Sequence, residues 1–379
     1  MSKAKKTAET VKAYKVFNKD LVCRGFQYEI GKTFEIKGNI TCCAKGFHAC
    51  EFPLDVFEYY NMLNSRFCEV EQTGDISRDG NCTKVCSSKI KIVTELKLAD
   101  MIRLGVEWLL NATSSVLAKG DVKYANDNYC DYAEIVSSDY CAKIKSSSLA
   151  TKIKSSGGLA QIWSIGDFAK ISSSGNDASI YSNGGFADIW SSGNWSSIGS
   201  SGNSANIGSS SNYTQIGSSG DFAKIGSSGY YDTIGSSGDF AKISSSGKST
   251  KIASSGDYAI ICASGVYSCI GSNGYYARIY SSGERTNISS NGDSANVSSS
   301  GECTFVESSG NNSVVCCTGH GSIAKAKKGS WITLAEWKSS LGKRLDIPVC
   351  VKTEYVDGER IKEDTWYRIE NGEFVECKS

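Results

Sequence analysis

The sequence predicts a mainly β protein: a two-sided β-solenoid of about 18 residues per coil, between an α+β N-terminal domain and a small antiparallel β C-terminal module. Three observations predict it. An aliphatic residue recurs every nine positions from Ile135 to Val315 without an insertion. The surrounding residues repeat, as in segment 221–229, Asp-Phe-Ala-Lys-Ile-Gly-Ser-Ser-Gly. The residue two positions before the aliphatic one alternates between Ala and Ser or Thr. A strict short period indicates stacked, equivalent units.

Each unit is predicted to form one short strand and one corner. Ala223, Ile225 and Ser227 occupy alternate positions, so their side chains share one face of a strand. The Ser-Gly-Asp or Ser-Gly-Asn that follows is typical of a tight turn, in which Gly adopts a positive φ and Asp or Asn bonds its own backbone. The Ala–Ser/Thr alternation doubles the nine-residue period, which favours two strands per coil and two facing sheets. A Gly/Ser linker, the alternative that composition suggests, does not keep an aliphatic phase over this length.

A serine ladder follows the aliphatic residues. The position two after each of them is Ser in all but two units, the exceptions being Ala263 and Cys317. A buried hydroxyl without a partner costs roughly 1–3 kcal/mol. We therefore expect each of these hydroxyls to bond a backbone group or its stacked neighbour.

Composition limits the function classes. A length of 379 residues allows two or three domains, and a net charge of +1 implies no global attraction to nucleic acid or membranes. No apolar run follows the basic start, so no signal peptide is predicted, and no stretch approaches a membrane span. The 16 cysteines lack a disulfide-framework spacing, and we interpret them as free thiols in a reducing compartment.

The N-terminal part is predicted as a disordered basic lead over 1–12 and an α+β domain over 13–130. Apolar spacing indicates strands at 13–17, 66–71 and 89–98, a helix at 54–63, and a longer helix at about 99–117. We expect this longer helix to cover the open end of the solenoid, because an uncovered end would expose core and strand edge.

The solenoid is predicted to occupy 131–319, since the period fails after Gly319. Residues 320–379 are predicted to form a β-rich capping module. Its strands are expected at 331–337, 347–356 and 365–369, and Asn371-Gly372 is a hairpin-turn signal.

Outward aromatic residues of the solenoid supply the candidate binding surface. One column, with one ring in every second unit, comprises Phe168, Phe186, Phe222, Phe240, Tyr258 and Tyr276, and Trp195, Tyr213, Tyr231 and Tyr267 form a second column on the opposite side. Trp163, Tyr181 and Trp190 add a cluster near the start, and Lys224 and Lys242 run beside the first column. Stacked rings can simply stabilise the corners. An ordered aromatic strip is alternatively a partner-binding surface. Nearby Asp residues offset the lysines, which disfavours nucleic acid as a ligand.

Three stretches carry a resemblance to proteins of phages and prophages. Gly46-Phe47-His48-Ala49-Cys50-Glu51 lies in the N-terminal part, and Gly329-Ser330-Trp331-Ile332-Thr333-Leu334 and Asp364-Thr365-Trp366-Tyr367 lie near the C-terminus. The chain resembles, over essentially its whole length, an uncharacterised family that joins such an N-terminal domain to Ser/Gly repeats and this tail. The resemblance implies a mobile-element origin and the cytoplasm of a bacterial host. It implies no activity.

The N-terminal domain also resembles ADP-ribosyltransferases of the poly-ADP-ribose-polymerase type. The resemblance rests on Gly46-Phe47-His48-Ala49-Cys50, on Tyr59-Tyr60, and on Cys68-Glu69-Val70-Glu71-Gln72-Thr73-Gly74. It implies NAD as cofactor, Tyr59 or Tyr60 stacking on nicotinamide, and His48 in the same site. The sequence departs from the family pattern at Tyr14-Lys15-Val16, where a His-Gly pair would hold the ribose, and it offers no match for a catalytic Glu.

The sequence gives few other signs of a metal site or a catalytic site. Cys42, Cys43, His48 and Cys50, with Cys82 and Cys86, match no zinc spacing, and we interpret them as buried thiols and an ordinary His without a metal. The two His residues lie in different modules, so no Ser-His-Asp set can be assembled.

Three functions are therefore carried forward. The favoured one is a non-catalytic binding protein that presents a rigid solenoid face to a host protein or complex, as an inhibitor of host defence would. The alternatives are an ADP-ribosyltransferase-like enzyme and a virion or surface adhesin or spacer. No membrane partner is expected, and the flat faces are compatible with a homodimer.

Overall fold

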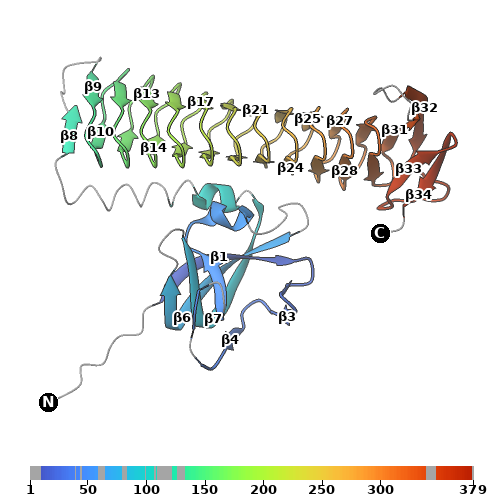
Figure 1. Cartoon of the computed structure of the whole chain (residues 1–379), viewed down its shortest axis with the longest axis horizontal. Helices are drawn as coiled ribbons and strands as arrows, with labels where there is room; N and C mark the ends of the chain where they lie inside the picture. The colour runs from blue at the N-terminus through green and yellow to red at the C-terminus, as the bar shows by residue number, and fades with distance from the viewer. Residues whose placement is uncertain are drawn as a thin grey trace. The chain divides into compact units, whose positions relative to one another are not determined.

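The computed structural model describes residues 10–38, 40–42, 45–58, 65–78, 83–98, 100–105, 108, 122–125, 133–338 and 347–377, with only the backbone of 122–125. Contacts divide the chain into two compact units, Met1–Trp108 and Leu109–Ser379. Figure 1 shows the small sheet of the first unit and the long ladder of short strands in the second. Each unit is described by itself.

The first unit is built on an antiparallel sheet. Its strands are β1 (Val11–Asn18), β4 (Thr33–Glu35), β5 (Phe47–Cys50), β6 (Ser65–Arg78) and β7 (Lys84–Leu96), in the order β4-β7-β5-β1-β6. β6 also pairs with β7, so the sheet closes on itself. A short hairpin, β2 (Val22–Cys23) and β3 (Phe26–Gln27), turns at Arg24-Gly25. β1 starts at Val11, within the lead that the sequence predicts over 1–12; residues 1–9 lie outside the described residues.

Helical structure in this unit is short. The 3-10 helix η1 (Pro53–Glu58) begins the helix predicted at 54–63, and residues 59–64 lie outside the described residues. Of the helix predicted at 99–117, residues 100–105 and 108 are described and helical, and they bury Met101 and Ile102 completely. Gly105 lies so close to Leu54 that an added Cβ would come within 2.7 Å of the Leu54 side chain. These residues pack within the first unit, and the covering of the solenoid end by this helix stays a prediction.

The second unit is the predicted β-solenoid (Figure 1). Four-residue strands recur every nine residues from β9 (Glu134–Ser137) to β30 (Ile323–Ala326). Each pairs in parallel with the second strand along the chain rather than with the next one, as β19 (Lys224–Ser227) does with β21 (Lys242–Ser245). Two parallel stacks result, which contribute to sheets of 14 and 13 strands among the described residues. The expectation of two strands per coil is confirmed.

The interior holds the predicted ladders. Ile225, Ala223 and Ser227 all point inward and are at most 6 % exposed, whereas Lys224 between them is exposed. Thr214 and Thr250 take the place of the inward Ala in the intervening units and are fully buried. Burying one Ile side chain stabilises the fold by roughly 1.5–3 kcal/mol. The aliphatic column therefore explains why the nine-residue phase is kept.

The glycines at the corners do not supply the positive φ that the sequence predicted for them. None of those described between residues 133 and 319, such as Gly229 or Gly238, has a positive φ. The left-handed residue is instead the second one after the glycine, as in Phe222 (φ 58°) and Tyr231 (φ 61°). A Cβ on Gly238 would lie 2.1 Å from the carbonyl oxygen of Gly220, one coil earlier. Glycine is required because consecutive coils approach each other closely there.

The expectation that every inward Ser hydroxyl is bonded is wrong for most of them. Hydroxyls that make no hydrogen bond to protein atoms include those of Ser155, Ser164, Ser173, Ser182, Ser200, Ser218, Ser236, Ser254, Ser272, Ser281, Ser290, Ser299 and Ser308. In some units the hydroxyl bonds a polar inward residue five positions later, as between Ser209 and Thr214 (2.9 Å). Ser281, Ser299 and Ser308 make no such bond, although Thr286, Thr304 and Ser313 occupy that position. After Ser164 that residue is Ala169, which offers no partner. The position selects a small side chain, since Ala263 fills it with a methyl group.

The parallel pairing extends beyond the predicted solenoid bounds of 131–319. At the start, β8 (Val122–Ala125) pairs with β10 (Lys143–Ser146). At the end, β30 pairs with β28 (Phe305–Ser308), and β31 (Trp331–Lys338) pairs with β29 (Val314–Cys317). The period fails in the sequence because Ala324 replaces the aliphatic residue and because Ile332, the partner of Val315, comes one position early.

The C-terminal module adds antiparallel strands to both sheets. β32 (Ile347–Tyr355) pairs with β31, and β33 (Tyr367–Glu370) joins β30 at Ala324 and continues into β34 (Glu373–Glu376). The predicted Asn371-Gly372 turn has φ values of 52° and 75°, as a two-residue hairpin requires. Each parallel stack thus ends on an antiparallel strand rather than on the exposed edge of its last coil.

Candidate functional site

The first aromatic column consists of Phe168, Phe186, Phe222, Phe240, Tyr258 and Tyr276. Its residues occupy the corners that lead from the 14-stranded to the 13-stranded sheet. Phe222, Phe240, Tyr258 and Tyr276 stack in sequence, with ring centroids 5.0–5.2 Å apart and planes within 8°. Phe168 and Phe186 form a separate stacked pair at 5.2 Å, because Ser204 interrupts the column. The predicted stacking is therefore present, but in two separate stacks rather than in one column of six rings.

These rings are exposed at their edges rather than at their faces. Their side chains are 44–57 % exposed. Most ring faces are covered by the neighbouring ring, so the column offers a strip of aromatic edges instead of faces on which bases could stack.

Two charged columns flank the first aromatic column. The carboxylates of Asp221, Asp239 and Asp257 precede the rings, and each Oδ1 accepts a hydrogen bond of 2.8–2.9 Å from the backbone N–H one coil later. The predicted bonding of these Asp side chains to their own backbone turn is therefore replaced by bonding between coils. Lys224 and Lys242 stand in register on the outward face two residues after the rings. Acidic, aromatic and basic columns thus run side by side.

The second aromatic column, Trp195, Tyr213, Tyr231 and Tyr267, occupies the opposite set of corners. Trp195 stacks on Tyr213 at 4.1 Å, and Tyr213 stacks on Tyr231 at 5.1 Å. Tyr267 lies beyond the gap at Ser249, and its hydroxyl accepts a hydrogen bond of 2.9 Å from Arg285 Nη1. The two columns are therefore carried by opposite edges of the flattened coil.

The cluster predicted from Trp163, Tyr181 and Trp190 is divided by the structure. Trp163 and Tyr181 lie in the same sheet, on β12 (Gln161–Ser164) and β14 (Ser179–Ser182), with rings edge to face at 6.1 Å. Trp190 lies on β15 (Asp188–Ser191) in the other sheet, 55 % exposed. A period of nine alternates between the two sheets, so residues 163 and 190 point to opposite sides of the coil.

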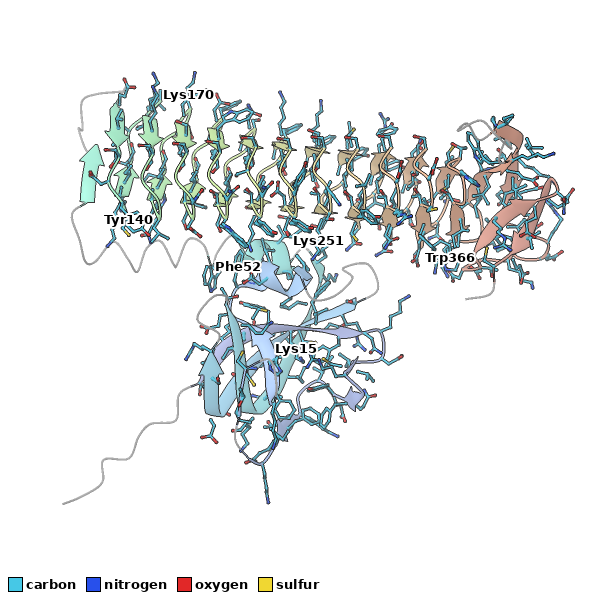
Figure 2. All side chains as sticks on the ribbon, in the orientation of Figure 1. Lys15, Phe52, Tyr140, Lys170, Lys251 and Trp366 are labelled. Carbon is cyan, nitrogen blue, oxygen red and sulfur yellow. The ribbon has the colours of Figure 1, made fainter. Side chains whose placement is uncertain are left out.

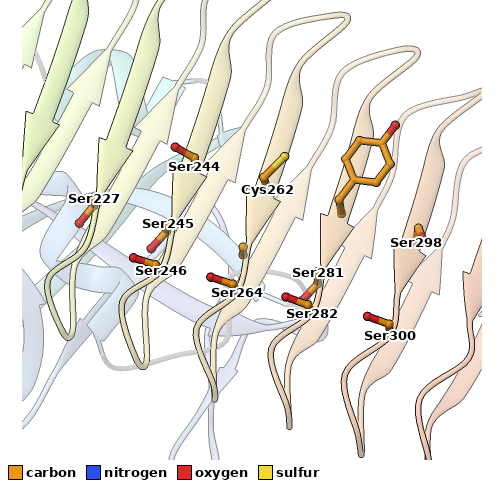
Figure 3. A pocket seen from close by; sticks show the side chains of 12 residues that line it. Ser227, Ser244, Ser245, Ser246, Cys262, Ser264, Ser281, Ser282, Ser298 and Ser300 are labelled. Carbon is orange, nitrogen blue, oxygen red and sulfur yellow. The ribbon is translucent and has the colours of Figure 1, made fainter.

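Sequence reasoning missed a hydroxyl-lined trough of about 470 Å³ on the outward side of the 13-stranded sheet. Figure 3 shows Ser244, Cys262 and Ser298 along its upper part and Ser246, Ser264, Ser282 and Ser300 along its lower part. Its signal in the sequence is the run of serines three positions after the aliphatic residue. The trough follows the stack of coils on the outward side of this sheet, whereas the aromatic columns lie at the corners.

The residues of the transferase alternative are only partly described. His48 lies on β5, where burial, with the positive charges of Lys15, Arg24 and Lys84, lowers its pKa. Tyr59 and Tyr60 lie outside the described residues. His48 lines a cavity of about 690 Å³ whose described lining includes neither Asp nor Glu. The cavity residue that sequence reasoning overlooked is Lys15, because a Lys within a strand is usually solvent-exposed.

Metal and membrane features are also limited to what is described. Cys43 and Cys82 lie outside the described residues. Among the described residues, no three His, Cys, Asp or Glu side chains lie close enough together to bind a metal ion. No disulfide joins any two of the 13 described cysteines. None of the helical segments that the structure describes has the length and hydropathy of a membrane-spanning helix.

Comparison with known proteins identifies one region. Residues 11–104 match a family model described as a domain of unknown function, DUF7666. This region corresponds to the first unit and excludes the solenoid. No curated protein and no solved structure shows a significant match to the chain.

Proposed function

We propose that this chain is a non-catalytic binding protein of phage or prophage origin that presents the aromatic edges of a rigid β-solenoid to a host protein. Inhibition of a defence complex in the bacterial cytoplasm is the role that fits such a protein. The proposal concerns the two aromatic columns and the charged columns beside the first of them.

The observation that carries the proposal is that the fold does not need the rings. Ser204 and Ser249 occupy the same corner positions at φ 61° and 58°, close to the 57° of Phe240. A left-handed conformation is costly for a bulky residue and nearly free for Gly or Asn. Large, half-exposed rings therefore recur where small residues would serve the backbone at least as well, and binding accounts for them.

The chemistry of the strip favours a protein partner. Most ring faces are covered and cannot stack on bases, and the Asp221 column offsets the positive charge of Lys224 and Lys242. The two main sources of nucleic-acid affinity are therefore weak on this strip. Aromatic anchors flanked by polar rims are typical of protein interfaces. The cavity holding His48 lacks a carboxylate among its described lining residues, so the binding role takes precedence over ADP-ribosyl transfer.

The test is affinity capture from the infected or lysogenic host with wild-type protein and two triple variants. Phe222, Phe240 and Tyr258 are replaced by Ser, which the corner already tolerates. The matched control replaces exposed Val136, Ile165 and Val314 by Ser, outside both columns. We expect one stoichiometric host protein with wild type and control and none with the column variant. Retention of that protein by the column variant would contradict the proposal, and recovery of the chain in purified virions would favour the adhesin alternative.

A further inference from the structure

A second candidate site lies between two strands of the first unit. β1 and β5 share one described residue pair, Tyr14 with Cys50, and their pairing stops there. The cavity of about 690 Å³ is lined by residues that follow Tyr14 in β1 and precede Cys50 in β5. Its volume lies within the range of small-molecule sites, about 300–1,000 Å³.

The cavity is strongly electropositive. Lys15, Arg24, Lys45 and Lys84 line it together with His48, and none of its described lining residues is Asp or Glu. The described ion pairs of this unit join its acidic residues to cations outside the cavity lining, as in Lys12–Glu69, Arg66–Glu95 and Lys91–Glu71.

Lys15 is the most informative of these cations. It is 6 % exposed, and Figure 2 places it among the strands of the first unit. Its Nζ donates a hydrogen bond of 2.8 Å to the carbonyl oxygen of His48 and lies 5.7 Å from the centroid of the Tyr28 ring. Burial lowers the pKa of this amine, although the nearby thiols of Cys23 and Cys50 act in the opposite direction. Burying an ammonium is costly unless an anion compensates it.

Aromatic rings form another part of the lining. Phe26, Tyr28 and Phe47 contact one another edge to face, with centroids 4.8–6.1 Å apart. Phe26 is 45 % exposed at the end of the hairpin that carries Arg24. The site therefore combines an anion-attracting group of cations with an apolar, aromatic surface.

We propose that this cavity binds a small phosphorylated molecule that carries a flat ring, with the phosphate at Lys15 and Arg24 and the ring against Phe26. Four cations around one cavity suit a phosphate, which carries more charge and more acceptor oxygens than a carboxylate. Arg in particular binds phosphate through paired hydrogen bonds. The site is independent of the proposed function, because it lies in the first unit and uses no solenoid residue.

The test is isothermal titration calorimetry of the full chain with AMP, ribose 5-phosphate, adenosine and benzoate. We expect saturable binding of AMP, binding of ribose 5-phosphate at least tenfold weaker, and no saturable heat from adenosine or benzoate. Absence of AMP binding at millimolar concentration would overturn the proposal. Tighter binding of benzoate or adenosine than of AMP would overturn it as well.

Variants locate the site. Lys15→Met, which replaces the buried ammonium by an unbranched apolar group, and Arg24→Asn are each expected to weaken AMP binding at least tenfold. Arg24 has a φ of 50°, a conformation that Asn tolerates well, so this variant is expected to fold. Lys91→Met is the control, because Lys91 is exposed and pairs with Glu71 outside the cavity. Unchanged AMP affinity in both cavity variants, or an equal loss in the control, would place any binding elsewhere and contradict the assignment.

Discussion

The backbone N–H of Thr214 donates a hydrogen bond of 2.7 Å to Oδ1 of Asp232, one coil further along the solenoid. Asp232 is fully buried at an inward position that other coils fill with Ser or Thr, and its second oxygen accepts a hydrogen bond from Ser227. Burial raises its pKa to about 6, although these hydrogen bonds favour the charged form. A carboxyl group thus stands inside a column of hydroxyls.

Replacing Asp232 by Thr is expected to remove a pH dependence of stability. The unfolded state ionises this carboxyl near pH 4, whereas the folded state keeps its proton until about pH 6. The contribution of Asp232 is therefore constant below about pH 4, falls between pH 4 and 6, and is lower by about 3 kcal/mol above that window.

Urea denaturation at intervals from pH 4 to 8 measures this effect. The free energy of unfolding of Asp232→Thr should exceed that of wild type by a margin that grows to about 3 kcal/mol above pH 6. Asp257→Asn is the control, because it replaces a partly exposed carboxylate that bonds the next coil. If the unfolding free energies of wild type and Asp232→Thr change with pH in parallel, the pKa of the buried carboxyl is not raised, which would contradict this account.

Gly238→Ala is expected to destabilise the solenoid severely. The added Cβ would lie 2.1 Å from the carbonyl oxygen of Gly220, and the backbone of the adjacent coil cannot move without breaking its own ladder. We expect a loss of about 3 kcal/mol, the upper end of ordinary overpacking. Gly226→Ala is the matched control, since its Cβ would meet only Ser244 Oγ, at 3.8 Å. Equal stability of the two variants in chemical denaturation would refute the close-approach explanation of the corner glycines.

Thiol reactivity should separate the cysteines by burial. Burial raises the pKa of Cys68 and of Cys317 to about 12, so both are almost entirely protonated at pH 8. Cys141, Cys262 and Cys303 are exposed. We expect a thiol reagent at pH 8, read out by peptide mapping, to label these three while Cys68 and Cys317 react only on unfolding. Equal labelling rates for Cys68 and Cys262 in the native protein would contradict the described packing.

The solenoid could be predicted because its determinants are local and periodic. Ile225 and its equivalents give the strand phase, and the exchange of Ala223 for Thr214 in the neighbouring unit reveals two strands per coil. The reason for the corner glycines could not be predicted from the local sequence. Gly238 must be glycine because the carbonyl oxygen of Gly220, a full coil earlier in the chain, leaves no room for a Cβ. The last coils were missed because Ala324 is small and because the loop before Ile332 is one residue short.

The candidate sites were predictable to different degrees. The first aromatic column follows directly from spacing, since Phe222 and Phe240 occupy the same corner of successive coils and must stack. Trp163 and Trp190 were grouped wrongly, because nearness in sequence hides the alternation between sheets. Lys15 was overlooked because its burial depends on β5 and on the Arg24 hairpin, which come later in the chain.

The most direct test of the binding surface is the affinity of the captured host protein for wild type and for the variant with Ser at Phe222, Phe240 and Tyr258. Calorimetry of the purified pair should give a dissociation constant at least 100-fold higher for the variant than for wild type. The melting temperature of the variant should stay within a few degrees of that of wild type. An affinity within twofold of wild type would mean that the rings serve only the corners, and the proposed surface would then be wrong.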